Sequence, residues 1–247
     1  MKLFSWVRWA LGFACINGLA AETTVAVAAN FSRPMQEIAA AFARSTGHQA
    51  VLVIGSTGKL SAQIRNGAPF DVFLAADQVT PQRLAADGFG GEDSIFTYAV
   101  GRLALWSAQP TLVDSRGAIL ATGDFRRLAL ADPKLAPYGA AAIEVLTALK
   151  LDARLRPRMV LGDSVGQAFL FVASGNAALG FVSLSQVQSD GRLRSGSVWL
   201  VPQNLYTPLR QDFVMLKRGS TNIAAQQLAL FLRGAAARTI IRSHGYH

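Results

Sequence analysis

Apolar strands, short turns and helices alternate along this chain, and four of the turns share one character. In each of them an apolar run ends in small or polar residues, and a helical pattern follows. The four turns are Ala29–Ser32, Gly55–Gly58, Ala136–Gly139 and Asp163–Gly166. Because the first turn of a helix has unpaired backbone N–H groups and a partial positive charge, each turn favours an anion. With no obvious catalytic base among them, the four turns predict a binding site built from neutral hydrogen-bond donors.

The strand–turn–helix rhythm predicts an α/β fold of two lobes, each a mostly parallel sheet flanked by helices. We expect lobe I to comprise residues 22–102 plus 205–247, and lobe II residues 103–204. The apolar run 95–106 is longer than a typical strand, and we expect it to leave lobe I and enter lobe II. Ligands collect at the carboxyl ends of strands in open α/β sheets, so the two turns of each lobe should face one another.

The positions of apolar runs, prolines and glycines predict the individual elements. Pro34 suits the first turn of a helix, and Gly47 ends that helix. The expected strands are 24–29, 50–54, 70–75, 128–131, 159–161, 180–184, 198–201 and 213–216. The expected helices are 34–45, 59–65, 80–87, 139–149, 165–174, 221–233 and 235–243.

Residues 1–21 are typical of a secretory signal peptide. A basic start precedes an apolar stretch, residues 6–20, that is too short to span a bilayer comfortably. Small residues ending at Ala21 then supply a cleavage region. An uncleaved membrane anchor and a lipid-modified Cys15 are the two alternatives. We expect the chain to be exported.

The composition excludes several kinds of chemistry. Cys15 is the only cysteine, so the exported chain would have no disulfide, cysteine metal site or cysteine nucleophile. The histidines His48, His244 and His247 lack metal-ligand spacing, and we expect no metal cation to be bound directly. The formal charge is +9, but the arginines are scattered rather than gathered with aromatic residues. We therefore expect no nucleic-acid partner.

One short motif points to a different class of protein. Residues 162–166, Gly-Asp-Ser-Val-Gly, match the nucleophile elbow of serine hydrolases in the required strand–turn–helix context. A hydrolase would need a later histidine, and His244 is the internal candidate, with Asp190 or Asp212 as the acid. We expect His244 to lie in a C-terminal tail outside any pocket, which favours a chance match. A serine hydrolase that uses Ser164 stays open as the rival function.

Each of the four turns offers at least one hydrogen-bond donor. Asn30 supplies an amide, Ser56 and Thr57 supply hydroxyls, Tyr138 supplies a phenol and Val165 supplies its backbone N–H. The structural alternative is that Asn30, and Ser164 in the fourth turn, are plain helix caps, each stabilising its helix by ~1 kcal/mol. The same exposed amides could serve either purpose, so capping and ligand binding are compatible.

At these residues the chain resembles the periplasmic molybdate-binding proteins of ABC transporters, which are two-lobed (type II) solute-binding proteins. The similarity extends in order through nearly all of the chain after the signal peptide. The similar segments are Val25–Phe31, Gly55–Gly58, Ile64–Pro69, Phe73–Asp77, Ala136–Gly139 and Ser164–Ala168. The Asn-Gly-Ala-Pro segment followed by a strand and Ala-Asp is especially diagnostic.

The resemblance implies that molybdate, and probably also tungstate, is bound between the lobes through N–H and hydroxyl groups. The implied ligand residues are Asn30, Thr57, Tyr138 and Val165, with Ala29, Ser56 and Ser164 as secondary candidates. The resemblance also implies a periplasmic monomer that has no cofactor, catalyses no reaction and delivers its ligand to an ABC transporter permease.

The chemistry of the anion agrees with a site made of donors. Molybdate at neutral pH is a deprotonated tetrahedral dianion, which only accepts hydrogen bonds. A protonated phosphate would turn its own hydrogen toward another donor, and such an unpaired polar group costs ~1–3 kcal/mol. Asp163 could accept that hydrogen if its carboxylate lay in the site. Sulfate also only accepts hydrogen bonds, so sulfate or another tetrahedral oxyanion is the alternative ligand, to be separated by cavity size.

Overall fold

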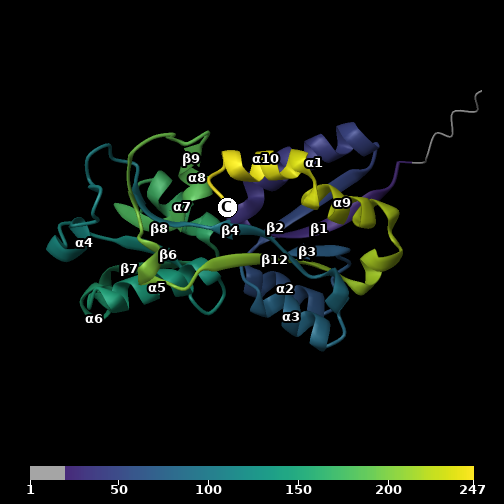
Figure 1. The fold of residues 1–247 in the computed structure, drawn as a ribbon. Helices are drawn as coiled ribbons and strands as arrows, with labels where there is room; N and C mark the ends of the chain where they lie inside the picture. The colour runs from purple at the N-terminus through teal and green to yellow at the C-terminus, as the bar shows by residue number, and fades with distance from the viewer. Residues whose placement is uncertain (1–19) are drawn as a thin grey trace, which may run out of the picture.

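The computed structural model describes residues 20–247, which form two lobes, each built on a five-stranded sheet (Figure 1). Apart from its last two residues, the predicted signal peptide lies outside the described residues, as does Cys15. The first sheet has the order β2-β1-β3-β12-β4 and comprises β1 (Glu22–Ala28), β2 (Gln49–Gly55), β3 (Val72–Leu74), β4 (Phe96–Gly101) and β12 (Leu209–Met215). The second has the order β11-β5-β8-β6-β7 and comprises β5 (Leu103–Ser107), β6 (Leu128–Ala131), β7 (Met159–Gly162), β8 (Leu179–Ser183) and β11 (Ser197–Leu200).

In each sheet four strands run in one direction and one strand is reversed. In the first sheet β1 pairs parallel with β2 and β3, whereas β12 pairs antiparallel with β3 and β4. In the second sheet β6 pairs parallel with β7 and β8, and β5 is antiparallel to β8 and β11. Each reversed strand is the first that the chain forms after crossing between the lobes. The predicted two-lobed α/β fold is confirmed, while the lobe boundaries themselves stay a prediction.

Helices cover both faces of each sheet (Figure 1). Those of the first lobe are α1 (Ser32–Thr46), α2 (Thr57–Arg65), α3 (Val79–Ala86), α9 (Ile223–Arg233) and α10 (Ala235–Ser243). Those of the second lobe are α4 (Ile119–Thr122), α5 (Pro137–Ala148), α6 (Asp152–Leu155), α7 (Val165–Ala173) and α8 (Leu184–Val187). In the described range no helix has the length and apolar content needed to cross a membrane.

Alternating side chains of the strands fill a core on each face. Val25 and Val27 of β1 pack with α1, α9 and α10, whereas Ala26 between them packs with α2 and α3. In the second lobe Leu105 of β5 faces the α5 side and Trp106 faces the α7 side. Successive side chains of a strand point to opposite faces, so these strands are apolar throughout.

The crossing from the first lobe to the second differs from the single long strand predicted over 95–106. The structure divides this run at Arg102 into β4 and β5, one in each sheet. The returning strand β12 begins at Leu209, four residues before the predicted start. Its first residues include polar side chains, and a β-bulge between Gln211 and Asp212 accommodates them against β4. An apolar pattern alone identifies neither the break nor the bulge.

The C-terminal tail is packed into the first lobe rather than standing free of it. His244 and Tyr246 are each 3% exposed. The backbone of His247 pairs with that of Val100 on β4, through N–H to carbonyl contacts of 2.8 and 3.2 Å. The His244 imidazole Nε2 lies 3.0 Å from Glu37 Oε1 on α1. The tail therefore closes the first lobe beside the crossing.

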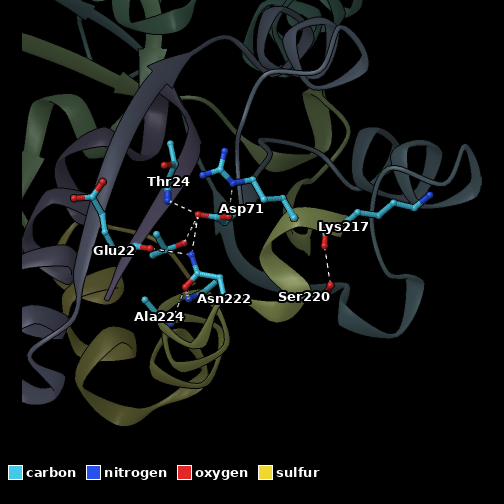
Figure 2. Close-up of polar contacts among 10 residues, drawn as sticks. Glu22, Thr24, Asp71, Lys217, Ser220, Asn222 and Ala224 are labelled. Atoms are coloured by element: carbon cyan, nitrogen blue, oxygen red, sulfur yellow. Dashed lines mark hydrogen bonds and ion pairs between the residues drawn. The ribbon is translucent and has the colours of Figure 1, made fainter. Parts of the chain in front are cut away.

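Asp71, just before β3, ties the amino ends of the strands to α9 (Figure 2). Its Oδ2 accepts hydrogen bonds from the Thr24 N–H at 2.8 Å and from Asn222 Nδ2 at 3.1 Å. Arg218 Nε forms an ion pair with Oδ1 at 3.3 Å. Asn222 Oδ1 in turn caps α9 by accepting the Ala224 N–H at 2.9 Å. The one carboxylate thus joins β1, β3 and α9 at the end of the sheet opposite the four turns.

Candidate anion-binding site

The four predicted turns converge on one small cavity between the lobes. Its volume is about 10 Å³, close to the smallest cavity that admits one water molecule. The walls contain all seven predicted site residues, together with small neighbours from both lobes. The lining residues are Ala28, Ala29, Asn30, Ser56, Thr57, Ala76, Ala136, Pro137, Tyr138, Ser164 and Val165. None of them has a charged side chain, so the cavity offers neutral hydrogen-bonding groups to a ligand.

The turn before α2 holds the first pair of hydroxyls. Ser56 caps the helix, because its Oγ accepts the Lys59 N–H at 3.4 Å. The Thr57 Oγ1 accepts the Ala76 N–H at 3.0 Å, which leaves the hydroxyl hydrogen of Thr57 to be donated. Gly58 donates its N–H to the Leu135 carbonyl of the other lobe at 2.9 Å. This turn therefore combines a cap, a hydroxyl donor and a contact between the lobes.

The turn before α7 places Val165 at the first position of the helix, where its N–H has no partner within the helix. Ser164 caps this helix by accepting the Gln167 N–H at 3.3 Å, as the capping alternative predicts. The Asp163 carboxylate is paired with the first lobe, its Oδ2 lying 2.5 Å from Lys59 Nζ. The Asp163 side chain is 61% exposed and does not line the cavity. No carboxylate is thus available there for a protonated anion.

Asn30 is buried in the short helix η1 (Ala29–Phe31), and its side chain caps no helix. Its Nδ2 donates to Gln211 Oε1 at 2.9 Å and to the Tyr246 hydroxyl at 3.0 Å. Both amide hydrogens therefore already have protein acceptors. Sequence reasoning offered this amide as a donor to the ligand and, alternatively, as a cap. The structure instead uses it to join Asn30 to β12 and to the C-terminal tail.

Tyr138 enters the cavity wall from the start of α5, directly after Pro137 at the first helical position. Its hydroxyl oxygen accepts hydrogen bonds from Ser183 Oγ at 3.0 Å and from Gln211 Nε2 at 3.3 Å. Burial raises the pKa of Tyr138 well above its ordinary value, and the neighbouring Tyr246 raises it further. The phenol therefore keeps its hydrogen at neutral pH and can act as a donor.

Comparison with known proteins agrees with this arrangement. The sequence model of the bacterial extracellular solute-binding proteins matches residues 23–247. The chain belongs to this family. Among solute-binding proteins, the molybdate-binding protein ModA of Azotobacter vinelandii is 52% identical over 227 residues, which cover 92% of this chain and 90% of that protein. The ModA protein of Rhodobacter capsulatus is 47% identical over 242 residues, 96% of this chain and 94% of that protein.

A solved structure supports the same placement. The periplasmic molybdate-binding protein of Azotobacter vinelandii superimposes with a TM-score of 0.88 at 42% identity. The superposition covers 91% of this chain and 98% of that one. The resemblance to molybdate-binding proteins that the sequence indicated is therefore confirmed, and the relatives of this solute-binding protein are binding proteins of transport systems.

The rival hydrolase geometry is not formed in the part of this solute-binding protein that the structure describes. Ser164 Oγ is occupied as a helix cap, and the His244 imidazole contacts Glu37 on another helix. No hydrogen bond joins Ser164 to a histidine in residues 20–247. The same range holds no group of three or more side chains able to bind a metal cation.

Sequence reasoning missed a buried network behind the cavity. It consists of the side chains of Tyr98, Ser183, Ser185, Gln211 and Tyr246. The Ser185 Oγ and the Tyr246 hydroxyl each donate to the Asn30 carbonyl at 2.8 Å, which joins the second lobe to the first. Ser183 ends the apolar strand β8 and so gave a local signal, but nothing in the pattern brings it together with the other four residues.

Proposed function

We propose that this solute-binding protein captures molybdate, and also tungstate, between its lobes at the four turns and delivers it to the permease of an ABC transporter. One observation carries the proposal most directly. Helix N-termini from both lobes meet around a cavity that presents donors and no charged side chain. Such a site suits a dianion that only accepts hydrogen bonds. The names of the two similar ModA proteins support molybdate over other oxyanions.

The ligand groups follow from the hydrogen bonds that the protein leaves unused. Thr57 and Tyr138 contribute hydroxyl hydrogens, and Val165 contributes its backbone N–H. Asn30 contributes its backbone N–H, because its side-chain amide is already bound. Ala29, Ser56 and Ser164 complete the wall, with the two serines holding their helices in place.

Capture uses the contacts that join the lobes. A ligand held by both lobes stabilises the closed arrangement by its extra affinity for it. The Gly58–Leu135 hydrogen bond and the Lys59–Asp163 ion pair belong to this closed arrangement. The permease then recognises the closed pair of lobes, and no covalent chemistry is involved. We place this step in the periplasm and assign it to a monomer exported by the predicted signal peptide.

Calorimetric titration of the purified protein with molybdate, tungstate, sulfate and phosphate tests the proposal. We expect tight binding of the first two anions and none of phosphate. Tight binding of sulfate with no response to molybdate would assign the cavity to another oxyanion. Ester hydrolysis that is lost in Ser164→Ala would favour the hydrolase instead.

A further inference from the structure

Gln211 is a fully buried glutamine on β12 that links the two proposed ligand residues Asn30 and Tyr138. Its Oε1 accepts from Asn30 Nδ2 at 2.9 Å and from the Tyr98 hydroxyl at 3.0 Å. Its Nε2 donates to the Tyr138 hydroxyl at 3.3 Å. One amide therefore connects a residue of the first lobe to a residue of the second.

The direction of these hydrogen bonds is set by a backbone carbonyl. The Asn30 carbonyl can only accept, and the Tyr246 hydroxyl donates its single hydrogen to it at 2.8 Å. The Tyr246 oxygen must then accept from Asn30 Nδ2, which lies 3.0 Å away. The second hydrogen on Nδ2 points at Gln211, so Oε1 faces Asn30 and Nε2 faces Tyr138.

This direction decides what the Tyr138 phenol can do. Its oxygen accepts from Gln211 on one side and from Ser183 Oγ on the other, so both acceptor positions are filled. The one hydroxyl beside it, Ser183 Oγ, acts as the donor to Tyr138, so none of the hydrogen bonds within residues 20–247 uses the phenol's own hydrogen. Tyr138 lines the cavity, and its hydrogen is therefore left to a ligand there.

We infer that Gln211 is a positioning residue that fixes the Tyr138 phenol as a hydrogen-bond donor to the bound anion. By doing so it makes the cavity select fully deprotonated oxyanions, since the phenol has no lone pair left for an anion's hydrogen. This inference rests on the proposed function. It assigns part of the selectivity to a residue that does not touch the ligand.

The variant Gln211→Glu reverses the direction without changing the shape. An ionised carboxylate can only accept, so Tyr138 would donate its hydrogen to position 211 and withdraw it from the anion. A protonated carboxyl group can still donate to Tyr138, as Nε2 does. Burial favours the protonated form at low pH. We therefore expect molybdate affinity within about 5-fold of wild type at pH 6 and about 100-fold weaker at pH 9.

Few other groups can titrate near position 211. Its direct neighbours include the phenols of Tyr98 and Tyr138, with Tyr246 beyond Asn30, and burial raises the pKa of all three. The carboxylates of Asp77 and Asp212 act on Tyr98. All of these groups are also present in the wild-type protein. The pH dependence of its molybdate affinity therefore measures their effect and can be subtracted from that of the variant.

Two further variants separate hydrogen-bond direction from packing. Gln82→Glu makes the same chemical change on an exposed position of α3, and we expect affinity within about 2-fold of wild type at both pH values. Gln211→Met fills the same space without a donor or a carboxylate. It frees one lone pair of Tyr138, so we expect the preference for molybdate over phosphate to fall about 10-fold relative to wild type at each of the two pH values.

Calorimetric titrations of the four proteins with molybdate and phosphate at pH 6 and pH 9, with thermal unfolding to check folding, test the inference. Equal affinity of Gln211→Glu and wild type at pH 9 would overturn it. So would equal losses at both pH values, which would indicate a packing role. If Gln211→Glu does not fold, unchanged selectivity in Gln211→Met would overturn it. Failure of the wild-type protein to bind molybdate would instead reject the proposed function.

Discussion

The Tyr138 hydroxyl lies directly against the backbone of Gly101, the last residue of β4. A Cβ added at Gly101 would overlap both this hydroxyl and the Gln211 amide nitrogen. Because Gly101 has no side chain, the Tyr138 hydroxyl of α5 can lie against β4 and accept the hydrogen bond from Gln211 Nε2. The absence of one methyl group thus lets the phenol take its place in the cavity wall.

Gly101→Ala is expected to weaken molybdate binding by about 10-fold or more, because the displaced hydroxyl loses its alignment. Overpacking at a buried site also costs about 1–3 kcal/mol of unfolding free energy. Calorimetry and urea unfolding measure the two effects. Gly91→Ala is the control, since a Cβ there would meet only ordinary contacts with Ser94. Unchanged affinity in Gly101→Ala would contradict the placement of Tyr138.

Asp163→Asn is expected to leave the rejection of phosphate unchanged. The Asp163 carboxylate points to Lys59 and does not line the cavity, so it accepts no hydrogen from a bound anion. Loss of this exposed ion pair should weaken molybdate binding by less than about 5-fold, and the difference should shrink as salt is added. Competition titrations at low and high ionic strength measure both quantities. A gain of phosphate binding in the variant would show that the carboxylate reaches the site.

Stability is expected to fall steeply above about pH 10. Burial raises the pKa of all four tyrosines, Tyr98, Tyr138, Tyr206 and Tyr246. A group with a higher pKa in the folded state stabilises it fully below the unfolded pKa, and this contribution is lost as pH rises through the folded pKa. Urea unfolding from pH 7 to pH 11 should therefore show a plateau followed by a decline. Phenolate absorbance should appear together with unfolding, and its appearance in the folded protein near pH 10 would contradict this account.

Asp71→Ala is expected to lower the unfolding free energy by about 3 kcal/mol, because the half-buried Thr24 N–H and the Asn222 amide lose their acceptor (Figure 2). Molybdate affinity should change by less than about 2-fold, since Asp71 lies at the opposite end of the sheet. Urea unfolding and calorimetry give the two values. Asp124→Ala removes an exposed carboxylate and should alter neither. A large loss of affinity in Asp71→Ala with normal stability would contradict this separation.

The sequence predicts the parts of the fold that depend on local pattern. Apolar runs with clear ends, such as the strand before Asn30 and the helix before Gly47, appear within a few residues of their expected positions. The crossing near Arg102 does not, because two strands that belong to different sheets read as one apolar run. The start of β12 at Leu209 is also not predicted, because its first residues are polar and their partners are distant in the chain.

The site shows the same division. Helix starts and their donors can be read from the turns, and all seven predicted residues meet at one cavity. The hydrogen bonds of the Asn30 side-chain amide could not be predicted, because its acceptors on Gln211 and Tyr246 are 181 and 216 positions away in the sequence. A tail residue such as Tyr246 carries no local signal that it will be buried. Long-range pairing of polar side chains decides which donors remain for the ligand.

The two passages of the chain between the lobes run beside each other. Gly101 stands opposite Leu209 in the first sheet, and the Val201 N–H donates to the Leu103 carbonyl at 3.1 Å. Because two paired segments join the lobes at one edge, we expect the lobes to open as rigid bodies about this pair. A single distance between a label on α2 and a label on α7 would then follow the whole movement, which makes this protein a natural frame for an optical oxyanion sensor.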